Sequence, residues 1–205
     1  MTKKYLFIIS TLMLSCVYFS QAQEFKAGLF AGITPSQVDG DHQSGFYKVG
    51  FTGGLFVNRS LNKGKLQGEI AFTLKGSRPA SKAVDYAPEL SFSYIDLSVY
   101  YIIGVWGENL FLRAGVVPSV LIDNSTGGHG YYSYGNNASS EWRTFSTELS
   151  IGLDYHFSEH WSINAAYNYS AFSIHKGNLT FLGLRPAETN AHYNNYIKLY
   201  LAYQF

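Results

Sequence analysis

The sequence predicts an all-β fold, an eight-stranded antiparallel up-and-down transmembrane β-barrel with short periplasmic turns and longer extracellular loops. Eight segments alternate apolar and polar residues with a period of two, which is the period of a β-strand. Charged residues make up only 14% of the chain and aromatic residues 17%, whereas about 25% of a typical soluble domain is charged. The connections between the segments alternate between long and short, which is the asymmetry of bacterial outer-membrane barrels.

The alternation is clearest at the end of the chain, in residues 195–205. One parity is apolar or aromatic throughout and comprises Ile197, Leu199, Leu201, Tyr203 and Phe205. The other parity includes Lys198, which we expect to point toward other charges inside the barrel. Because the chain stops on an aromatic residue within this strand, we expect the strand to close against the first one, with its apolar face in lipid. Phe205 should then lie near Phe25.

Residues 1–22 are expected to be a cleaved signal peptide, which leaves 23–205 as a single outer-membrane barrel domain. Two lysines precede an apolar stretch, 5–19, that is shorter than the roughly 20 residues of a membrane-spanning helix. A small-x-small cleavage site ends at Ala22. Cleavage would remove Cys16, the only cysteine, and would turn the formal charge from +1 to −1. The mature chain should therefore contain no disulfide and no basic surplus for binding nucleic acid.

The first four strands are predicted at 25–34, 47–58, 65–75 and 90–103. Their large apolar residues keep to one parity, represented by Leu29 and Ile33, then Phe51 and Leu55, then Ile70 and Phe72, then Ile95, Leu97 and Val99. The opposite parity is polar or rich in glycine in the first three strands and polar or aromatic in the fourth. Each segment is long enough for a tilted crossing of a membrane, which takes about 9–11 residues.

The last four strands are predicted at 110–122, 142–157, 161–172 and 195–205. The apolar parity of the first three is represented by Leu112 and Val116, then Leu149, Ile151 and Leu153, then Ile163 and Tyr167. Pro118 lies within the first of these strands. Because proline cannot donate a hydrogen bond to a neighbouring strand, we expect a bulge near the far end of 110–122.

Seven connections join the predicted strands. The four longer ones are predicted on one side of the barrel, at 35–45, 76–89, 123–140 and 173–191. The three tight turns are predicted on the other side, at 59–64, 104–109 and 158–160. Both ends of the barrel domain should then lie on the periplasmic side.

The orientation of the two parities separates a membrane barrel from a lipocalin-like soluble barrel, whose apolar face would line a pocket. The polar parity is short and contains Gly28, Gly32, Gly50, Gly54, Gly115 and Gly152. Small residues fit the crowded inside of an eight-stranded barrel. The charges on this parity nearly cancel, as a buried ion-pair network requires: Lys26, Lys48, Lys75, Arg113, Lys198, Glu69, Asp96, Glu148 and Asp154. We therefore expect the polar parity inside and lipid outside.

Aromatic residues gather near both ends of the predicted strands. At the turn end these are Phe25, Phe56, Trp106, Phe157, Trp161, Tyr203 and Phe205. At the loop end they include Phe46, Tyr47, Phe92, Trp142, Phe172 and Tyr193. Two such girdles are typical of a membrane barrel at its two interfaces, so both sets are expected to face the interfaces.

Several short motifs follow a recognisable order along the chain. They are Gly28-Leu29-Phe30-Ala31-Gly32, Gly40-Asp41, Lys48-Val49-Gly50-Phe51, Leu74-Lys75-Gly76-Ser77, Tyr94-Ile95-Asp96-Leu97-Ser98-Val99, Leu112-Arg113-Ala114-Gly115 and Tyr203-Gln204-Phe205. Together they resemble the PorT-like outer-membrane β-barrel family of Bacteroidetes, although a proline is usual where this chain has Ser98. The resemblance implies an OmpA-like eight-stranded barrel and a final strand read by the barrel-assembly machinery. One family member is tied to type IX secretion, which makes a secretion-associated role an expectation.

The polar residues do not predict a catalytic, cofactor-binding or metal-binding site. His156 and Asp154 share the inner face, where a hydrogen-bonded structural pair is expected. A nominal triad of His129, Ser125 or Ser133, and Asp123 falls in a loop that cannot hold catalytic geometry. Carboxylates such as Glu69 and Asp96 are expected to neutralise Lys75 or Arg113. We therefore predict no catalytic residue, no cofactor and no metal.

The sequence thus favours a non-enzymatic integral protein of the Gram-negative outer membrane with a structural or docking role. A Tyr-, Gly-, Ser- and Asn-rich loop, 126–137, has the composition of adaptable recognition loops, which suits binding of a glycan or of an envelope protein partner. The simpler interpretation, which we favour, is a disordered loop or one that faces lipopolysaccharide. Outer-membrane lipid and lipopolysaccharide are further expected partners, and nucleic acid is not. The alternatives are a lipid-modifying outer-membrane enzyme and a narrow pore. A pore is disfavoured because charge pairs would fill the lumen of eight strands.

Overall fold

The computed structural model describes residues 25–41, 43–80, 89–127, 142–176 and 191–205. The predicted signal peptide and most of the recognition loop therefore lie outside the described residues. Within these residues, no helix has the length and apolar character needed to span a membrane.

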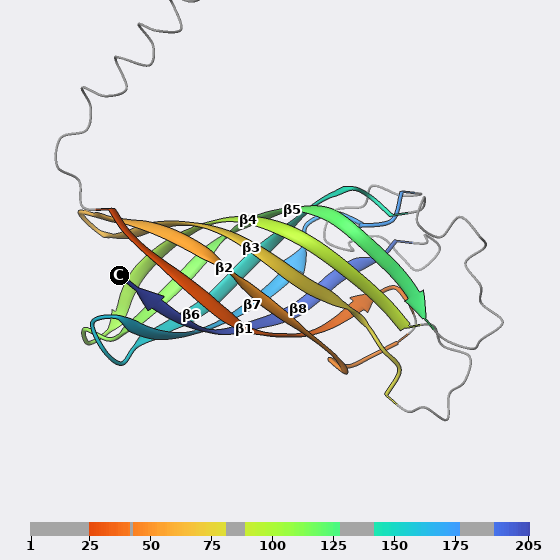
Figure 1. Ribbon diagram of the computed structural model, residues 1–205, viewed down its shortest axis with the longest axis horizontal. Helices are drawn as coiled ribbons and strands as arrows, with labels where there is room; N and C mark the ends of the chain where they lie inside the picture. The colour runs from red at the N-terminus through yellow and green to blue at the C-terminus, as the bar shows by residue number, and fades with distance from the viewer. Residues whose placement is uncertain (1–24, 42, 81–88, 128–141, 177–190) are drawn as a thin grey trace, which may run out of the picture.

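The eight predicted strands are present, and they form one closed antiparallel barrel in which each strand pairs with its neighbours in the sequence (Figure 1). Their bounds are β1 (Phe25–Asp39), β2 (Lys48–Leu61), β3 (Gly64–Ser77), β4 (Glu89–Trp106), β5 (Leu110–Gly127), β6 (Phe145–His156), β7 (Trp161–Ser170) and β8 (Tyr193–Gln204). β1 begins and β8 ends at the same end of the barrel, where the three short turns also lie (Figure 1). The predicted fold class is confirmed.

The barrel closes between β1 and β8, as the alternation in the final strand predicts. Leu29 pairs with Tyr203 and Ile33 with Leu199 in an antiparallel register. One step beyond the strand, the Phe205 amide donates a hydrogen bond of 2.9 Å to the Ala27 carbonyl. The seam is therefore continuous from the turn end of the barrel toward its middle.

Proline interrupts the backbone ladder on one side of a strand without ending the strand. β1 continues past Pro35, which pairs with Val49 of β2, whereas the pairing with β8 is missing at this point and resumes at Ser36. Proline lacks the N–H that would donate a hydrogen bond to one neighbouring strand. Its carbonyl can still accept a hydrogen bond, and its fixed φ is tolerated where one side of the strand is unpaired. For this reason β1 runs to Asp39 and is longer than the predicted segment 25–34.

Pro118 behaves in the same way, and the expected bulge lies elsewhere. The pairing of β5 with β6 is continuous through Pro118, which pairs with Thr147. On the other side of the strand, Val117 and Pro118 have no partner in the pairing of β5 with β4. Of the two register shifts between β4 and β5, the one at this end lies between Ser93 and Tyr94, opposite Asp123 and Leu121, so that Ile122 is the extra residue. The prediction of a bulge near the far end of this strand is confirmed, but its attribution to Pro118 is wrong.

The two parities face the predicted directions. Outward-facing residues such as Leu55, Ile151 and Leu201 are exposed around the whole barrel, whereas the opposite parity is buried. The girdle assignment was wrong for four aromatic residues, because Phe56, Phe92, Trp142 and Tyr193 are all buried. Phe56 and Phe92 have inward parity, and depth along the barrel does not alter the face on which a side chain lies. The exposed girdle residues include Phe25, Tyr47, Trp106, Phe157, Trp161, Phe172 and Phe205.

Candidate functional site

The lumen contains two clusters of buried charges, and the first lies nearer the short turns. In this turn-side cluster, Glu69 accepts from Arg113 at 2.7 Å and from Lys198 at 3.0 Å. Arg113 also lies 3.5 Å from Asp154 and donates a hydrogen bond to the Tyr200 hydroxyl. The Tyr200 hydroxyl in turn lies 2.8 Å from Glu69. Strands on opposite sides of the barrel are thus linked through the lumen.

The second cluster lies nearer the long loops. In this loop-side cluster, Lys75 lies 3.4 Å from Asp96 and 3.1 Å from Glu148, and all three side chains are fully buried. Ser119 Oγ lies 2.7 Å from Asp96 Oδ1 and 2.8 Å from Glu148 Oε2, so this hydroxyl bridges the two carboxyl groups. Asn194 Nδ2 lies 3.4 Å from Glu148 Oε1. The cluster therefore links five side chains from β3, β4, β5, β6 and β8.

The two clusters confirm the predicted charge network for most of its members. Glu69 and Asp96 neutralise basic side chains, and Lys198 points inward. Two basic residues lie outside the clusters. Lys48 pairs with Glu89 at 2.5 Å near the loop end, and Lys26 lies at the turn end.

An aromatic cluster occupies the inside of the barrel at the loop end. Its buried members are Val38, Leu90, Phe92, Tyr94, Trp142 and Ile174. The Trp142 ring centroid lies 4.8 Å from that of Phe92, 5.7 Å from that of His175 and 5.4 Å from that of His192. Residue 142 and the segment after β7 turn inward, which is why β6 begins at Phe145 and β7 ends at Ser170. The position of Phe92 in this outer aromatic cluster could have been predicted from the sequence, because Phe92 has the same inward parity as Tyr94 and Asp96.

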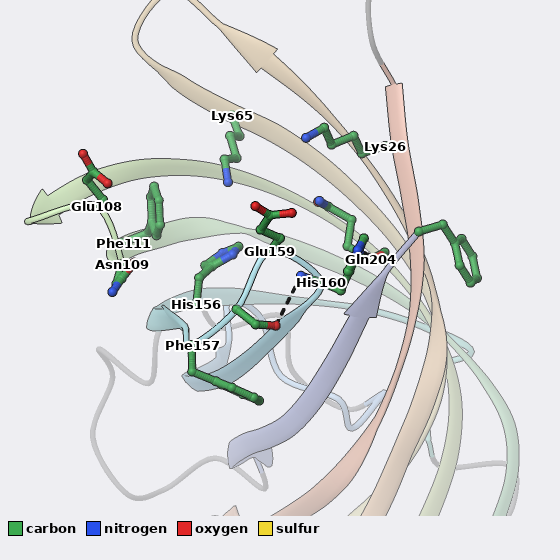
Figure 2. Close-up of a pocket in the computed structure, with 12 residues that line it drawn as sticks. Lys26, Lys65, Glu108, Asn109, Phe111, His156, Phe157, Glu159, His160 and Gln204 are labelled. Carbon is green, nitrogen blue, oxygen red and sulfur yellow. Dashed lines mark hydrogen bonds between the residues drawn. The ribbon is translucent and has the colours of Figure 1, made fainter.

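At the opposite end the barrel opens into a polar vestibule of about 560 Å³ (Figure 2). Lys26, Lys65, His156, His160 and Gln204 point into it from separate strands and from the β6–β7 turn. A small recess of about 20 Å³ adjoins the vestibule, and its lining includes Asp154 and Asn164. The vestibule therefore ends at the turn-side cluster, because Asp154 belongs to that cluster.

The residues considered for chemistry do not assemble into a reactive set among the described positions. Asp154 faces Arg113, whereas the His156 ring packs edge-on against Phe111 with centroids 4.9 Å apart, and no hydrogen bond joins Asp154 and His156. Asp123 and Ser125 belong to the regular strand β5, while His129 and Ser133 lie outside the described residues. The described part of the chain also contains no group of three or more His, Cys, Asp or Glu side chains placed to hold a metal ion.

Comparison with known proteins agrees with this architecture. No curated protein matches the chain significantly. Neisserial surface protein A (NspA) superimposes with a TM-score of 0.50 at 14% identity, over 88% of this chain and 97% of NspA, which supports the fold alone. Ail, the attachment invasion locus protein of Yersinia pestis, gives a TM-score of 0.45 at 14% identity, over 89% of this chain and 99% of Ail. The outer membrane enzyme PagL gives 0.37 at 14% identity, over 87% of this chain and 98% of PagL. The family described as outer membrane protein beta-barrel domain matches residues 19–176, which is most of the sequence, and the chain belongs to this family of outer-membrane proteins.

Proposed function

We propose that this chain is a non-enzymatic structural or docking protein of the bacterial outer membrane. The observation that carries this proposal is the filled lumen, in which Arg113, Lys75 and Lys198 are fully buried and paired with carboxylates. Side chains that fill the inside of an eight-stranded barrel leave its outer surface and its loops as the places where it can act. A barrel that presents loops and rims to its surroundings is suited to scaffolding.

The two alternative functions have less support. A narrow pore would need an open path through both charge clusters and through the outer aromatic cluster. A lipid-modifying enzyme would need a nucleophile and a base in contact, and His156 packs against Phe111 instead. Loss of a lipid-modifying activity on replacing His156 would favour the enzyme.

Lipopolysaccharide is the proposed lipid partner at the loop end. Gln37 and Asp39 are partly exposed there on the outward parity of β1, and Gln37 donates a hydrogen bond of 2.8 Å to Asp39. Tyr169 of β7 is also partly exposed, and its ring stacks on that of the buried Tyr193 with centroids 5.8 Å apart. Polar and aromatic side chains at this level suit contact with headgroups rather than with acyl chains. The barrel-assembly machinery is the proposed partner during insertion.

An envelope protein is the proposed partner of the long loops, and a secretion-associated role, as the resemblance to the PorT-like family suggests, is one form of this docking. Cross-linking followed by affinity purification of the tagged protein should recover a defined set of envelope proteins. Deleting residues 128–141 should abolish this recovery, because that segment carries most of the Tyr-, Gly- and Asn-rich recognition sequence. The deletion spares β5, which ends at Gly127.

The matched control is deletion of residues 81–88, which shortens a different long connection and should leave the recovered set unchanged. A complex that survives the loss of 128–141, or no reproducible complex at all, would contradict the loop-side docking role. A difference in electrophoretic mobility between boiled and unboiled samples shows that each variant still forms the barrel.

A further inference from the structure

The outward face of the barrel carries an apolar groove across β1–β4, in the half nearer the short turns. The groove has a volume of about 530 Å³, and its lining includes Ala27, Leu55, Val57, Gly68, Val99 and Phe205. Ala27, Val57, Gly68 and Val99 form one register row across the four strands. The small residues in this row form a hollow between larger neighbours.

Gly68 differs in role from the glycines inside the barrel. A Cβ built on Gly68 would meet only Val57 Cγ1, at 4.0 Å, so no close backbone approach requires glycine here. A Cβ built on the inward-facing Gly54 would lie 2.1 Å from the Ile70 carbonyl oxygen. Glycine at position 68 therefore leaves space on the lipid-facing surface.

A basic side chain lies directly beside the groove on its turn side. Arg59 has the same outward parity as Val57 and lies two residues further along β2, which corresponds to about 7 Å. It pairs in register with Phe25 and Leu66, next to the row that forms the groove. Arg59 Nε is buried, and the Arg59 side chain has no hydrogen-bond or ion-pair partner among the described residues. By contrast, Arg113 and Arg143 both have partners.

We propose that the groove and Arg59 together bind one phospholipid of the periplasmic leaflet, with an acyl chain in the groove and the phosphate diester on Arg59. A guanidinium suits this role because it donates two parallel hydrogen bonds to phosphate oxygens. Its aliphatic stem can lie along apolar surface while the charged end reaches the interface. Phe25 and Trp106 are exposed at the turn end and mark the level of that interface.

The groove lies near the short turns, and this position indicates which class of lipid it would bind. The short turns are periplasmic, so the groove faces the inner leaflet of the outer membrane, which consists of phospholipid, whereas lipopolysaccharide occupies the outer leaflet. This site goes beyond the general contact that every membrane barrel makes with lipid. It is also independent of the loop-side docking role, since residues 128–141 take no part in it.

Native mass spectrometry of the protein released from detergent micelles tests the site, with phosphatidylglycerol as the probe. We expect one phosphatidylglycerol to remain bound to the unmodified barrel. Arg59→Gln should weaken this binding about tenfold, because it removes the charged hydrogen bonds to phosphate. Gly68→Leu should weaken it to a similar extent, because its side chain fills the groove. Diacylglycerol with the same acyl chains should bind about tenfold more weakly than phosphatidylglycerol.

Two matched variants control for charge and for bulk. Lys26→Gln removes one positive charge at the same end of the barrel, but Lys26 points into the vestibule (Figure 2). Gly53→Leu adds the same side chain to the outward face at a position outside the groove, where a Cβ meets only the Phe30 carbonyl oxygen at 3.6 Å. Both should bind phosphatidylglycerol as the unmodified protein does.

Unchanged binding in either Arg59→Gln or Gly68→Leu would overturn the proposal, as would equal losses in the two controls. Boiled and unboiled samples compared by electrophoresis show that each variant is folded before lipid is added.

Discussion

Replacing Arg113 with glutamine is expected to lower the free energy of unfolding by about 3–5 kcal/mol, because removing one partner leaves buried opposite charges uncompensated. Arg113 is fully buried and lies between Glu69 and Asp154, at 2.7 and 3.5 Å. Its guanidinium carbon also lies 3.9 Å from the centre of the Tyr100 ring. Lys198 still pairs with Glu69 in the variant, whereas Asp154 would lose its ion-pair partner. Equilibrium unfolding in urea, in detergent micelles that contain no phospholipid, measures the change.

The matched control for this change is Arg59→Gln, the same substitution on the outward face. Arg59 has no ion-pair partner among the described residues, so this variant should change the free energy of unfolding by about 0.5 kcal/mol or less. An effect of Arg113→Gln below about 1 kcal/mol, or no larger than that of Arg59→Gln, would show that the turn-side cluster does not stabilise the barrel.

The second large effect is expected at the closing seam, where Gly32→Val should destabilise the barrel by about 3 kcal/mol or more. A Cβ built on Gly32 would lie 1.9 Å from the Leu199 carbonyl oxygen and 2.5 Å from Tyr200 Cα. These are backbone atoms of β8, the strand that β1 must meet, so relief of the clash would require the seam to separate. Electrophoresis of unboiled samples measures the folded fraction of the variant. Unfolding in urea then measures the stability of the folded protein.

Gly53→Val is the control for the closing seam. Gly53 faces outward on β2, and a Cβ there meets only the Phe30 carbonyl oxygen at 3.6 Å, which is ordinary contact. This variant should fold to the same extent as the unmodified protein. Equal folding of Gly32→Val and Gly53→Val would contradict the close approach of β1 and β8.

The sequence predicts the faces of the strands well, because alternation is a local property. The inward positions of Asp96, Arg113 and Lys198 follow directly from the parity of their strands. Alternation does not reveal which inward residues meet across the lumen. Lys75 of β3 contacts Glu148 of β6, and that contact depends on how far the strands are staggered around the barrel. The turns fix the register of neighbouring strands only, so the pairing within each cluster could not be predicted.

Depth along the barrel was the second property that alternation did not determine. Phe92 and Trp142 were expected in the outer girdle, since both lie near the ends of predicted strands. Phe92 faces inward on its strand, and Trp142 leaves the sheet to pack against it. An aromatic residue near a strand end can face lipid or fill the barrel mouth, and only the inward parity distinguishes the two. The groove beside Arg59 could not be predicted for a related reason, because alternation places Gly68 on the outward parity but does not show that it leaves a hollow there.

Two charge clusters and an aromatic cluster occupy the lumen from the turn side to the loop end. Current through single barrels in a planar lipid bilayer shows whether ions can cross this lumen, with a known porin in a separate bilayer of the same lipid as the positive control. We expect no stable conductance steps from the unmodified protein at any voltage the bilayer tolerates. Large, stable steps that change on replacing the lumen residue Lys198 with glutamine, and not on replacing Lys26 of the vestibule, would contradict a filled lumen and favour a pore.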